Sequence, residues 1–151
     1  MLDTGATTQL VIDTIGTISD LFVGDGIAPA EGGWSLGQPN TGEFVPYAVV
    51  AFMGARPRTP ELTMVKQEAA WLASFQLRYH GGSRAQVDWT GNACRRAVDS
   101  LLKATVITDV FYEIAWVEWQ SLGGVMRNDS VDPPIWNATD SLTLHAVKRG
   151  T

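Results

Sequence analysis

Few residues of this chain have the types and spacing that catalysis needs. Its two histidines, His80 and His145, lie far apart, and neither has the H-x₃-H or C-x₂-C spacing of a metal site. The single cysteine, Cys94, lies in the apolar stripe of a predicted helix with no histidine near it in sequence, which indicates a small core residue. No G-x-S-x-G elbow and no P-loop is present. We therefore expect no enzymatic activity and no cofactor.

The remaining candidate for chemistry is an acidic grouping of Asp129, Asp132 and Asp140. Loops rich in carboxylate oxygens can bind Ca²⁺, but the spacing D-x₂-D-x₇-D differs from that of an EF-hand loop. Asp132 precedes a proline and is a routine turn starter. Asp140 is expected to start the last strand or to cap a turn. The sequence thus predicts no metal site.

Length and charge limit the other function classes. The chain has 151 residues, which favours a single domain over 1–151, and 45% of them are hydrophobic, as in soluble globular proteins. The net charge of −5 argues against a domain that grips nucleic acid by neutralising phosphates. One cysteine forms no internal disulfide, so nothing indicates an oxidising compartment. No apolar stretch is long enough to span a bilayer, and no signal peptide is visible, so no membrane partner is expected.

The first half of the chain predicts one helix and one strand around a long loop. Residues 1–6 are expected to be frayed, and 7–22 to be a helix capped by Thr7 or Thr8, with apolar residues recurring at spacings of four, three and four. Residues 23–43 hold many glycines and prolines and the lone Trp34, which predicts a long loop. That loop either orders against a neighbouring subunit or is merely flexible. Residues 45–53 predict a strand, and 54–60 a turn with Arg56 and Arg58.

The second half predicts three strands and a helix. Residues 69–79 alternate in polarity, with Trp71, Phe75, Leu77 and Tyr79 on one face. Ser83 is a suitable N-cap for a helix whose apolar face ends at Leu101. In the predicted strand 110–120, Phe111, Glu113, Ala115, Val117 and Trp119 share one face and Tyr112, Ile114, Trp116 and Glu118 the other. A second long loop over 121–139 precedes a last strand over 140–148, whose polar outer side is typical of a sheet edge.

These elements predict an α+β fold. Sequential strands with short links favour a small antiparallel or mixed sheet of about four strands. The two helices would pack on one face of it, and the long loops would lie outside.

Three segments give the chain a resemblance to a known family. They are Ser74-Phe75-Gln76-Leu77-Arg78-Tyr79-His80-Gly81, Cys94-Arg95-Arg96-Ala97-Val98, and Gly124-Val125-Met126-Arg127-Asn128-Asp129 running into Trp136-Asn137-Ala138-Thr139-Asp140. With these segments the chain resembles the tail terminator proteins of long-tailed (siphovirus-type) bacteriophages, particularly those of actinobacterial hosts. The similarity extends from the first helix to about Lys148.

The resemblance implies a structural protein of the virion tail or neck, assembled in the host cytoplasm. Such a subunit forms a homo-oligomeric, hexameric ring that caps the tail tube and ends its polymerisation. One face of the ring meets the tail tube protein, and the other meets the head-completion (connector) proteins. Genomic DNA passes through the lumen without sequence-specific binding, with which the acidic balance of the chain is compatible.

A ring requires two different surfaces on each subunit, and seven residues are predicted to lie in subunit or partner interfaces. Tryptophan and arginine dominate interface hot spots. The seven are Trp34, Arg56, Arg58, Trp116, Arg127, Asp129 and Trp136. Two alternatives stay open. The chain is either another tail or neck component, such as a tube subunit or connector adaptor, or a small enzyme or ligand-binding module with its site under the glycine-rich loop.

Overall fold

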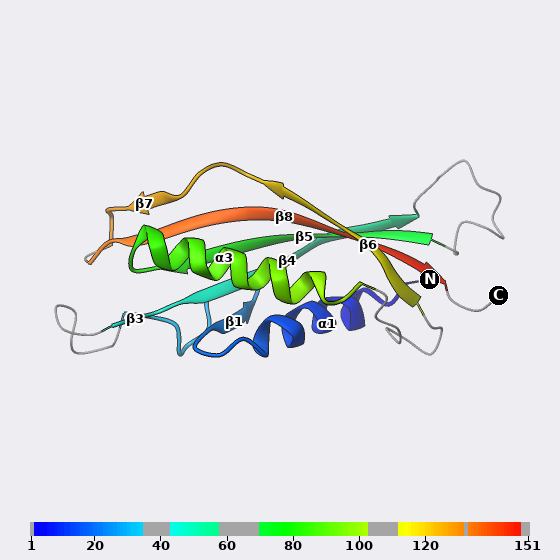
Figure 1. Cartoon of the computed structure of the whole chain (residues 1–151), viewed down its shortest axis with the longest axis horizontal. Helices are drawn as coiled ribbons and strands as arrows, with labels where there is room; N and C mark the ends of the chain where they lie inside the picture. The colour runs from blue at the N-terminus through cyan, green and yellow to red at the C-terminus, as the bar shows by residue number, and fades with distance from the viewer. Residues whose placement is uncertain (1, 35–42, 58–69, 103–111, 132, 149–151) are drawn as a thin grey trace.

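The computed structural model describes residues 2–34, 43–57, 70–102, 112–131 and 133–148. Within these ranges the chain forms two helices and eight strands (Figure 1). The helices are α1 (Thr4–Gly16) and α3 (Arg84–Asp99). The strands are β1 (Phe22–Asp25), β2 (Gly33–Trp34), β3 (Phe44–Val45), β4 (Tyr47–Pro57), β5 (Ala70–Gly81), β6 (Tyr112–Ser121), β7 (Met126–Asn128) and β8 (Ile135–Lys148).

The main sheet is mixed and has six strands in the order β1-β4-β5-β8-β6, with β7 pairing onto β8. Strand β1 runs parallel to β4, and the other pairs are antiparallel. Strands β2 and β3 form a separate two-stranded sheet. The predicted α+β class and mixed sheet are therefore confirmed, but the main sheet has six strands where about four were expected.

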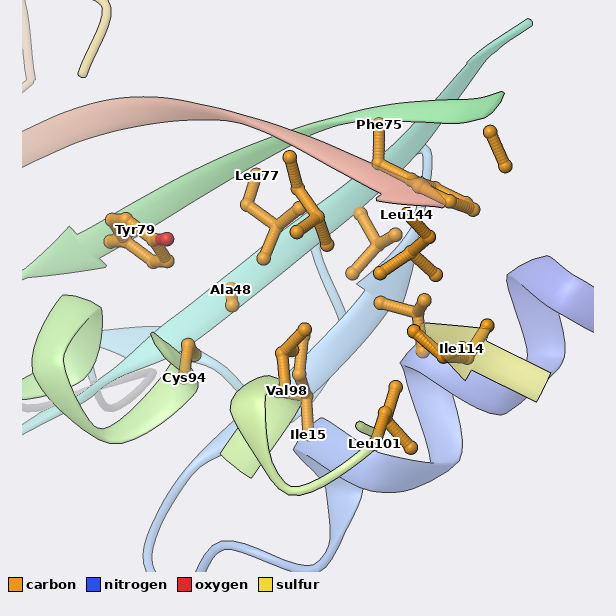
Figure 2. Close-up of a cluster of buried hydrophobic side chains, with 14 of the residues drawn as sticks. Ile15, Ala48, Phe75, Leu77, Tyr79, Cys94, Val98, Leu101, Ile114 and Leu144 are labelled. Carbon is orange, nitrogen blue, oxygen red and sulfur yellow. The ribbon is translucent and has the colours of Figure 1, made fainter. Parts of the chain in front are cut away.

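Both helices pack on the same face of the main sheet, as expected, and enclose the hydrophobic core (Figure 2). Period-two alternation points the inward residues of β5 and β8 at this face. Val11 and Ile15 of α1 and the Val87–Val98 stripe of α3 cover them. The strands contribute the buried side chains Ala48, Val50, Ala73, Phe75, Leu77, Tyr79, Leu142, Leu144 and Ala146. This single core fixes where each surface residue of the sheet must point.

The N-terminus differs from the expectation of a frayed lead. Leu2 is buried in the core, and helix α1 begins at Thr4 rather than at residue 7. Asp3 is the N-cap, because its carboxylate accepts a hydrogen bond from the Ala6 amide at 2.9 Å. The helix ends at Gly16, and Phe22 belongs to β1 instead of the helix. Between them Asp20 has a φ of 65°, a left-handed conformation that aspartate tolerates and that reverses the chain.

Three predicted loops contain strand. The segment 23–43 holds most of β1 and all of β2, while its residues 35–42 lie outside the described ranges. The predicted turn at 54–60 begins as the end of β4, because a β-bulge between Phe52 and Gly54 lets the strand continue to Pro57. Gly54 adopts a φ of 144°, which a residue with a side chain rarely does. Residues 135–139 of the second predicted loop belong to β8.

The prediction that the last strand lies at an edge is wrong. β8 lies between β5 and β6 and pairs with both over most of its length. Its inward residues Leu142, Leu144 and Ala146 are buried as expected. The outward residues are polar because they lie on the sheet face away from the helices, and polarity on one face does not distinguish an edge strand from a central one.

The predicted face assignment of β6 holds only before a second β-bulge, which lies between Ile114 and Trp116. Tyr112 and Ile114 point into the core, but the extra residue reverses the alternation. After the bulge Val117 and Trp119 pack against the core. Trp116 is thereby turned to the outer face, opposite to Tyr112 and Ile114, with which it was expected to share a face.

A smaller apolar cluster covers part of the outer face of the sheet. It consists of Phe44, Tyr47 and Val49, with Trp34 and Ile135 packed against them. The Tyr47 ring stacks on His80 with a centroid distance of 4.5 Å and an interplanar angle of 11°. The pKa of His80 is lowered to about 4, mainly by burial and to a smaller extent by the charge of the nearby Arg78. The imidazole is therefore neutral in the folded protein at neutral pH.

Loss of stability in mild acid is the expected consequence of the lowered pKa. An unfolded histidine gains its proton near pH 6.5, while folded His80 gains it only near pH 4, so stability falls as the pH drops through this window. After allowance for the partial exposure of the ring, the expected loss is about 1–2 kcal/mol. Urea unfolding of the wild type and of His80→Phe at pH 7 and pH 4.5 measures it. The phenylalanine keeps the stack but does not titrate, so the variant should lose less. An equal loss in both proteins would contradict the assignment.

Candidate subunit interface

Strand pairing brings three of the predicted interface residues together at one end of β8. β7 pairs with the start of β8, which places Arg127 opposite Trp136. The guanidinium carbon of Arg127 lies 6.0 Å from the centroid of the Trp136 ring, and its Nε lies 2.6 Å from Oδ1 of Asp129. Both charged side chains are more than half exposed. A surface ion pair of this kind contributes at most about 1 kcal/mol, so Arg127 can exchange Asp129 for another partner at little cost.

Trp34 lies next to this group and ties two distant segments of the chain together. Its Nε1 donates a hydrogen bond to the carbonyl oxygen of Pro133 at 3.1 Å, and its ring meets Phe44 edge-on at 5.1 Å. Trp136 is likewise partly buried, against the main core. Much of each indole is thus already used inside the subunit. Their role as interface anchors stays a prediction.

Two other predicted residues lie in one row across the outer face of the sheet. Arg56 on β4 is in register with Leu72 on β5, which is in register with His145 on β8, which is in register with Trp116 on β6. The Trp116 ring stacks on His145 at 5.1 Å and is 53% exposed. The structure therefore divides the predicted residues between this row and the β7 end of the sheet. Arg58 lies outside the described ranges.

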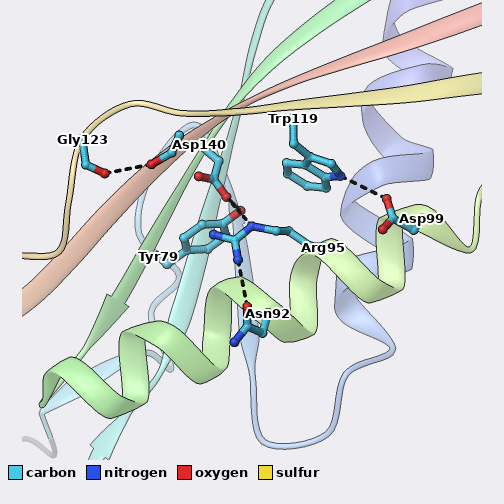
Figure 3. A network of polar contacts seen from close by, with 8 residues as sticks. Tyr79, Asn92, Arg95, Asp99, Trp119, Gly123 and Asp140 are labelled. Carbon is cyan, nitrogen blue, oxygen red and sulfur yellow. Dashed lines mark hydrogen bonds and ion pairs between the residues drawn. The ribbon is translucent and has the colours of Figure 1, made fainter.

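A buried polar junction holds helix α3 to the sheet (Figure 3). Oδ2 of Asp140 accepts a hydrogen bond from the Tyr79 hydroxyl at 2.8 Å and another from Nε of Arg95 at 2.9 Å. Arg95 also donates to Oδ1 of Asn92 at 2.9 Å. The Asp140 side chain is almost fully buried, whereas that of Arg95 is partly exposed. One carboxylate thus connects β5, β8 and α3.

The protonation states around this junction favour a structural role. Burial raises the pKa of the Tyr79 phenol far above its ordinary value, and the charge of Asp140 raises it further. Burial also raises the pKa of the Cys94 thiol to about 12. A phenol and a thiol in these states remain protonated at neutral pH and are poor bases and nucleophiles. The Tyr79 phenol and the Cys94 thiol therefore contribute to packing and hydrogen bonding within the fold.

Sequence reasoning missed this junction, although a signal was present. Asp140 has the same parity as Leu142, Leu144 and Ala146, so a strand that begins before residue 140 must direct its carboxylate into the core. A buried carboxylate requires partners, and the only candidates are donors on the facing elements. The sequence instead predicts Asp140 at the start of the last strand or as the cap of a turn. In the structure Asp99 accepts a hydrogen bond from Trp119 at 3.0 Å.

In the part of the chain that the structure describes, no three histidine, cysteine, aspartate or glutamate side chains converge as metal ligands would. Within the same residues, no helix has the length and apolar character needed to cross a membrane.

No protein-family model matches the chain, and no curated protein matches it.

Removal of the buried carboxylate should destabilise the fold. Asp140→Ala leaves Tyr79 and Arg95 without their acceptor and should lower the free energy of unfolding by about 2–4 kcal/mol. Asp140→Asn retains an oxygen acceptor and should lose less. The control is Asp129→Ala, because Asp129 forms an exposed ion pair whose loss should change the free energy of unfolding by at most about 1 kcal/mol. Urea unfolding at pH 7 measures all three. Equal, small losses for Asp140→Ala and Asp129→Ala would refute the role of the junction.

Proposed function

We propose that the chain is a structural subunit that assembles with copies of itself into a closed ring. The resemblance to tail terminators supplies the specific form of this proposal. It is a hexameric ring in the tail or neck of a bacteriophage virion, which caps the tail tube and ends its polymerisation. The ring joins the tail to head-completion proteins and lets DNA pass through its lumen.

The observation that carries the proposal is the presence of exposed, large apolar side chains on two opposite flanks of the sheet. On the β1 flank these are Phe22 and Trp89, and on the β6–β7 flank they are Trp116 and Met126. Each of the four is at least 41% exposed. A heterologous interface needs two different surfaces on every subunit, and it closes into a ring when the rotation between neighbours closes. The two flanks provide such a pair of surfaces.

Charge supports the part of the proposal that concerns DNA. With a net charge of −5 the chain has little capacity to neutralise phosphates. A lumen built from such subunits would let DNA slide through without holding it.

Two alternative functions of the chain also remain as proposals. A tube subunit or connector adaptor would use the same two flanks, but a tube subunit would assemble into open filaments. A small ligand-binding module is favoured by one observation, a cleft of about 800 Å³ on the β1 flank.

The native mass of the purified chain over a dilution series separates these functions. A discrete oligomer near six subunits supports the ring. Open filaments favour a tube subunit. A monomer at every concentration, combined with binding of a small molecule, favours the ligand-binding module.

Within the ring, Trp116→Ala should weaken assembly without harm to the subunit fold. The side chain lies mostly outside the core, and truncation of a tryptophan anchor typically costs about 2 kcal/mol or more of association free energy. The expected result is an oligomer that dissociates at a subunit concentration at least tenfold higher, with an unchanged unfolding midpoint for the monomer. Leu102→Ala, an exposed apolar residue just beyond α3, serves as the control. If the two variants dissociated at the same concentration, Trp116 would not be an interface residue.

A further inference from the structure

The cleft on the β1 flank is lined mainly by aromatic and apolar side chains. Phe22 of β1, Phe44 of β3 and Trp89 of α3 converge on it, with Pro46 between the strands. Phe22 and Trp89 remain 41% exposed, although they are large apolar groups. Isolated exposed apolar residues are common, but two aromatic rings that line one cleft indicate a surface that another group covers.

The charged residues of the cleft are acidic. Asp20 and Glu43 line it, and neither lysine nor arginine is among the described residues that do so. Asp20 lies in the turn between α1 and β1, where its backbone is left-handed. An occupant that combines an apolar group with a cation would therefore complement the cleft.

A segment with this combination lies on the opposite flank. Residues 122–131, which we call the β7 tip, expose Leu122, Met126 and Val131, and Met126 is 65% exposed. Arg127 supplies the cation, held only by the exposed Asp129 and the face of Trp136. A Cβ atom built at Gly123 or Gly124 would meet no atom within 4 Å, so this part of the tip has open space beside its backbone.

The two surfaces cannot meet within one subunit. β1 pairs with β4 at one edge of the sheet. β7 pairs with β8 at the opposite edge, and β5 lies between β4 and β8. Figure 1 shows the β7 tip above helix α3 and β1 below it. Surfaces on opposite flanks are the arrangement that a head-to-tail contact between copies requires.

We propose that the β7 tip of one subunit docks in the β1-flank cleft of the next. This inference rests on the proposed ring and names its subunit contact. Met126 packs between the rings of Phe22 and Trp89, since a thioether adapts to an aromatic pocket and makes favourable sulfur–aromatic contacts. Arg127 exchanges its exposed pair with Asp129 for Asp20 of the neighbour.

Site-directed cross-linking tests the contact. Ala85 lines the cleft on the exposed first turn of α3, and Val131 is an exposed residue of the tip. Ala85→Cys and Val131→Cys therefore place one thiol on each surface and leave Met126 in place. The native Cys94 is buried and its thiol has a pKa raised to about 12, so it does not compete for the reagent. A short bifunctional maleimide is then added to the double variant, and the products are separated under denaturing conditions.

The expected result is a ladder of linked chains that ends at the size of the native oligomer. A mixture of the two single variants should give linked dimers only. The control pair, Leu102→Cys with Val131→Cys, should stay unlinked between chains. Val131→Cys chains that link to one another when alone would indicate a symmetric contact and overturn the proposal.

Parallel measurement of the native mass separates this inference from the proposed function. A discrete oligomer without 85–131 links overturns the tip-in-cleft contact but leaves the ring intact. A monomer without links at the highest attainable concentration overturns both.

Point variants give a second readout of the same contact. Trp89→Ala and Arg127→Glu should each raise the dissociation concentration of the oligomer at least tenfold. Asp20→Asn should raise it a few-fold and keep the left-handed backbone, which asparagine also adopts. Glu31→Gln, a change of an exposed acid outside the cleft lining, is the control and should have no effect. If all the variants dissociated at the same concentration as Glu31→Gln, the proposed contact would be wrong.

Discussion

The central position of β8 is the constraint on which the rest of the structure depends. This strand pairs with β5 on one side and with β6 and β7 on the other. Its register therefore determines how all three neighbouring strands are aligned in the sheet. Because side chains alternate along a strand, a slip of one residue would turn Leu142, Leu144 and Ala146 out of the core. It would also withdraw Asp140 from Tyr79 and Arg95. The apolar pattern and the buried carboxylate therefore specify the same register, and the carboxylate extends that specification to helix α3.

That register also decides which surfaces remain available to a partner. The helices cover one face of the sheet, and the aromatic cluster around Tyr47 covers part of the other. The exposed large apolar groups include members on both flanks, where the strand order ends, and others on β4, among them Met53. The flanks differ in kind: the β1 flank is hollow and acidic, whereas the β6–β7 flank carries projecting side chains and a cation. This asymmetry favours contacts between unlike surfaces over a symmetric dimer.

The sequence predicts the regular parts of this fold and fails where backbone irregularities intervene. The α3 stripe, its Ser83 cap and the inward residues of β5 and β8 follow from periodicity alone, and the structure has them. The two β-bulges do not follow, because an inserted residue leaves no periodic trace, and one of them reverses the face of Trp116. The order of strands is equally hidden, since the polar outer side of β8 is compatible with an edge or a centre. The pairing of β7 with β8 places Arg127 opposite Trp136. The sequence indicates both residues as interface candidates but does not predict this pairing.

The same bulge in β6 bears on how copies of the chain can meet. A strand that ends a sheet presents unpaired backbone groups and invites another strand to add to it. Within the described residues β6 pairs only with β8, yet its outward side chains include Glu113 and Glu118, and the bulge at Ala115 interrupts its edge. Charges and bulges are the means by which natural sheets discourage edge-to-edge addition. Backbone pairing along β6 is thus disfavoured, and the projecting groups beside it, Trp116 and the β7 tip, become the parts of this flank best suited to contact a neighbour. A contact made through side chains is selective for a complementary cleft, and in the proposed ring the rotation between neighbours then decides whether the assembly closes.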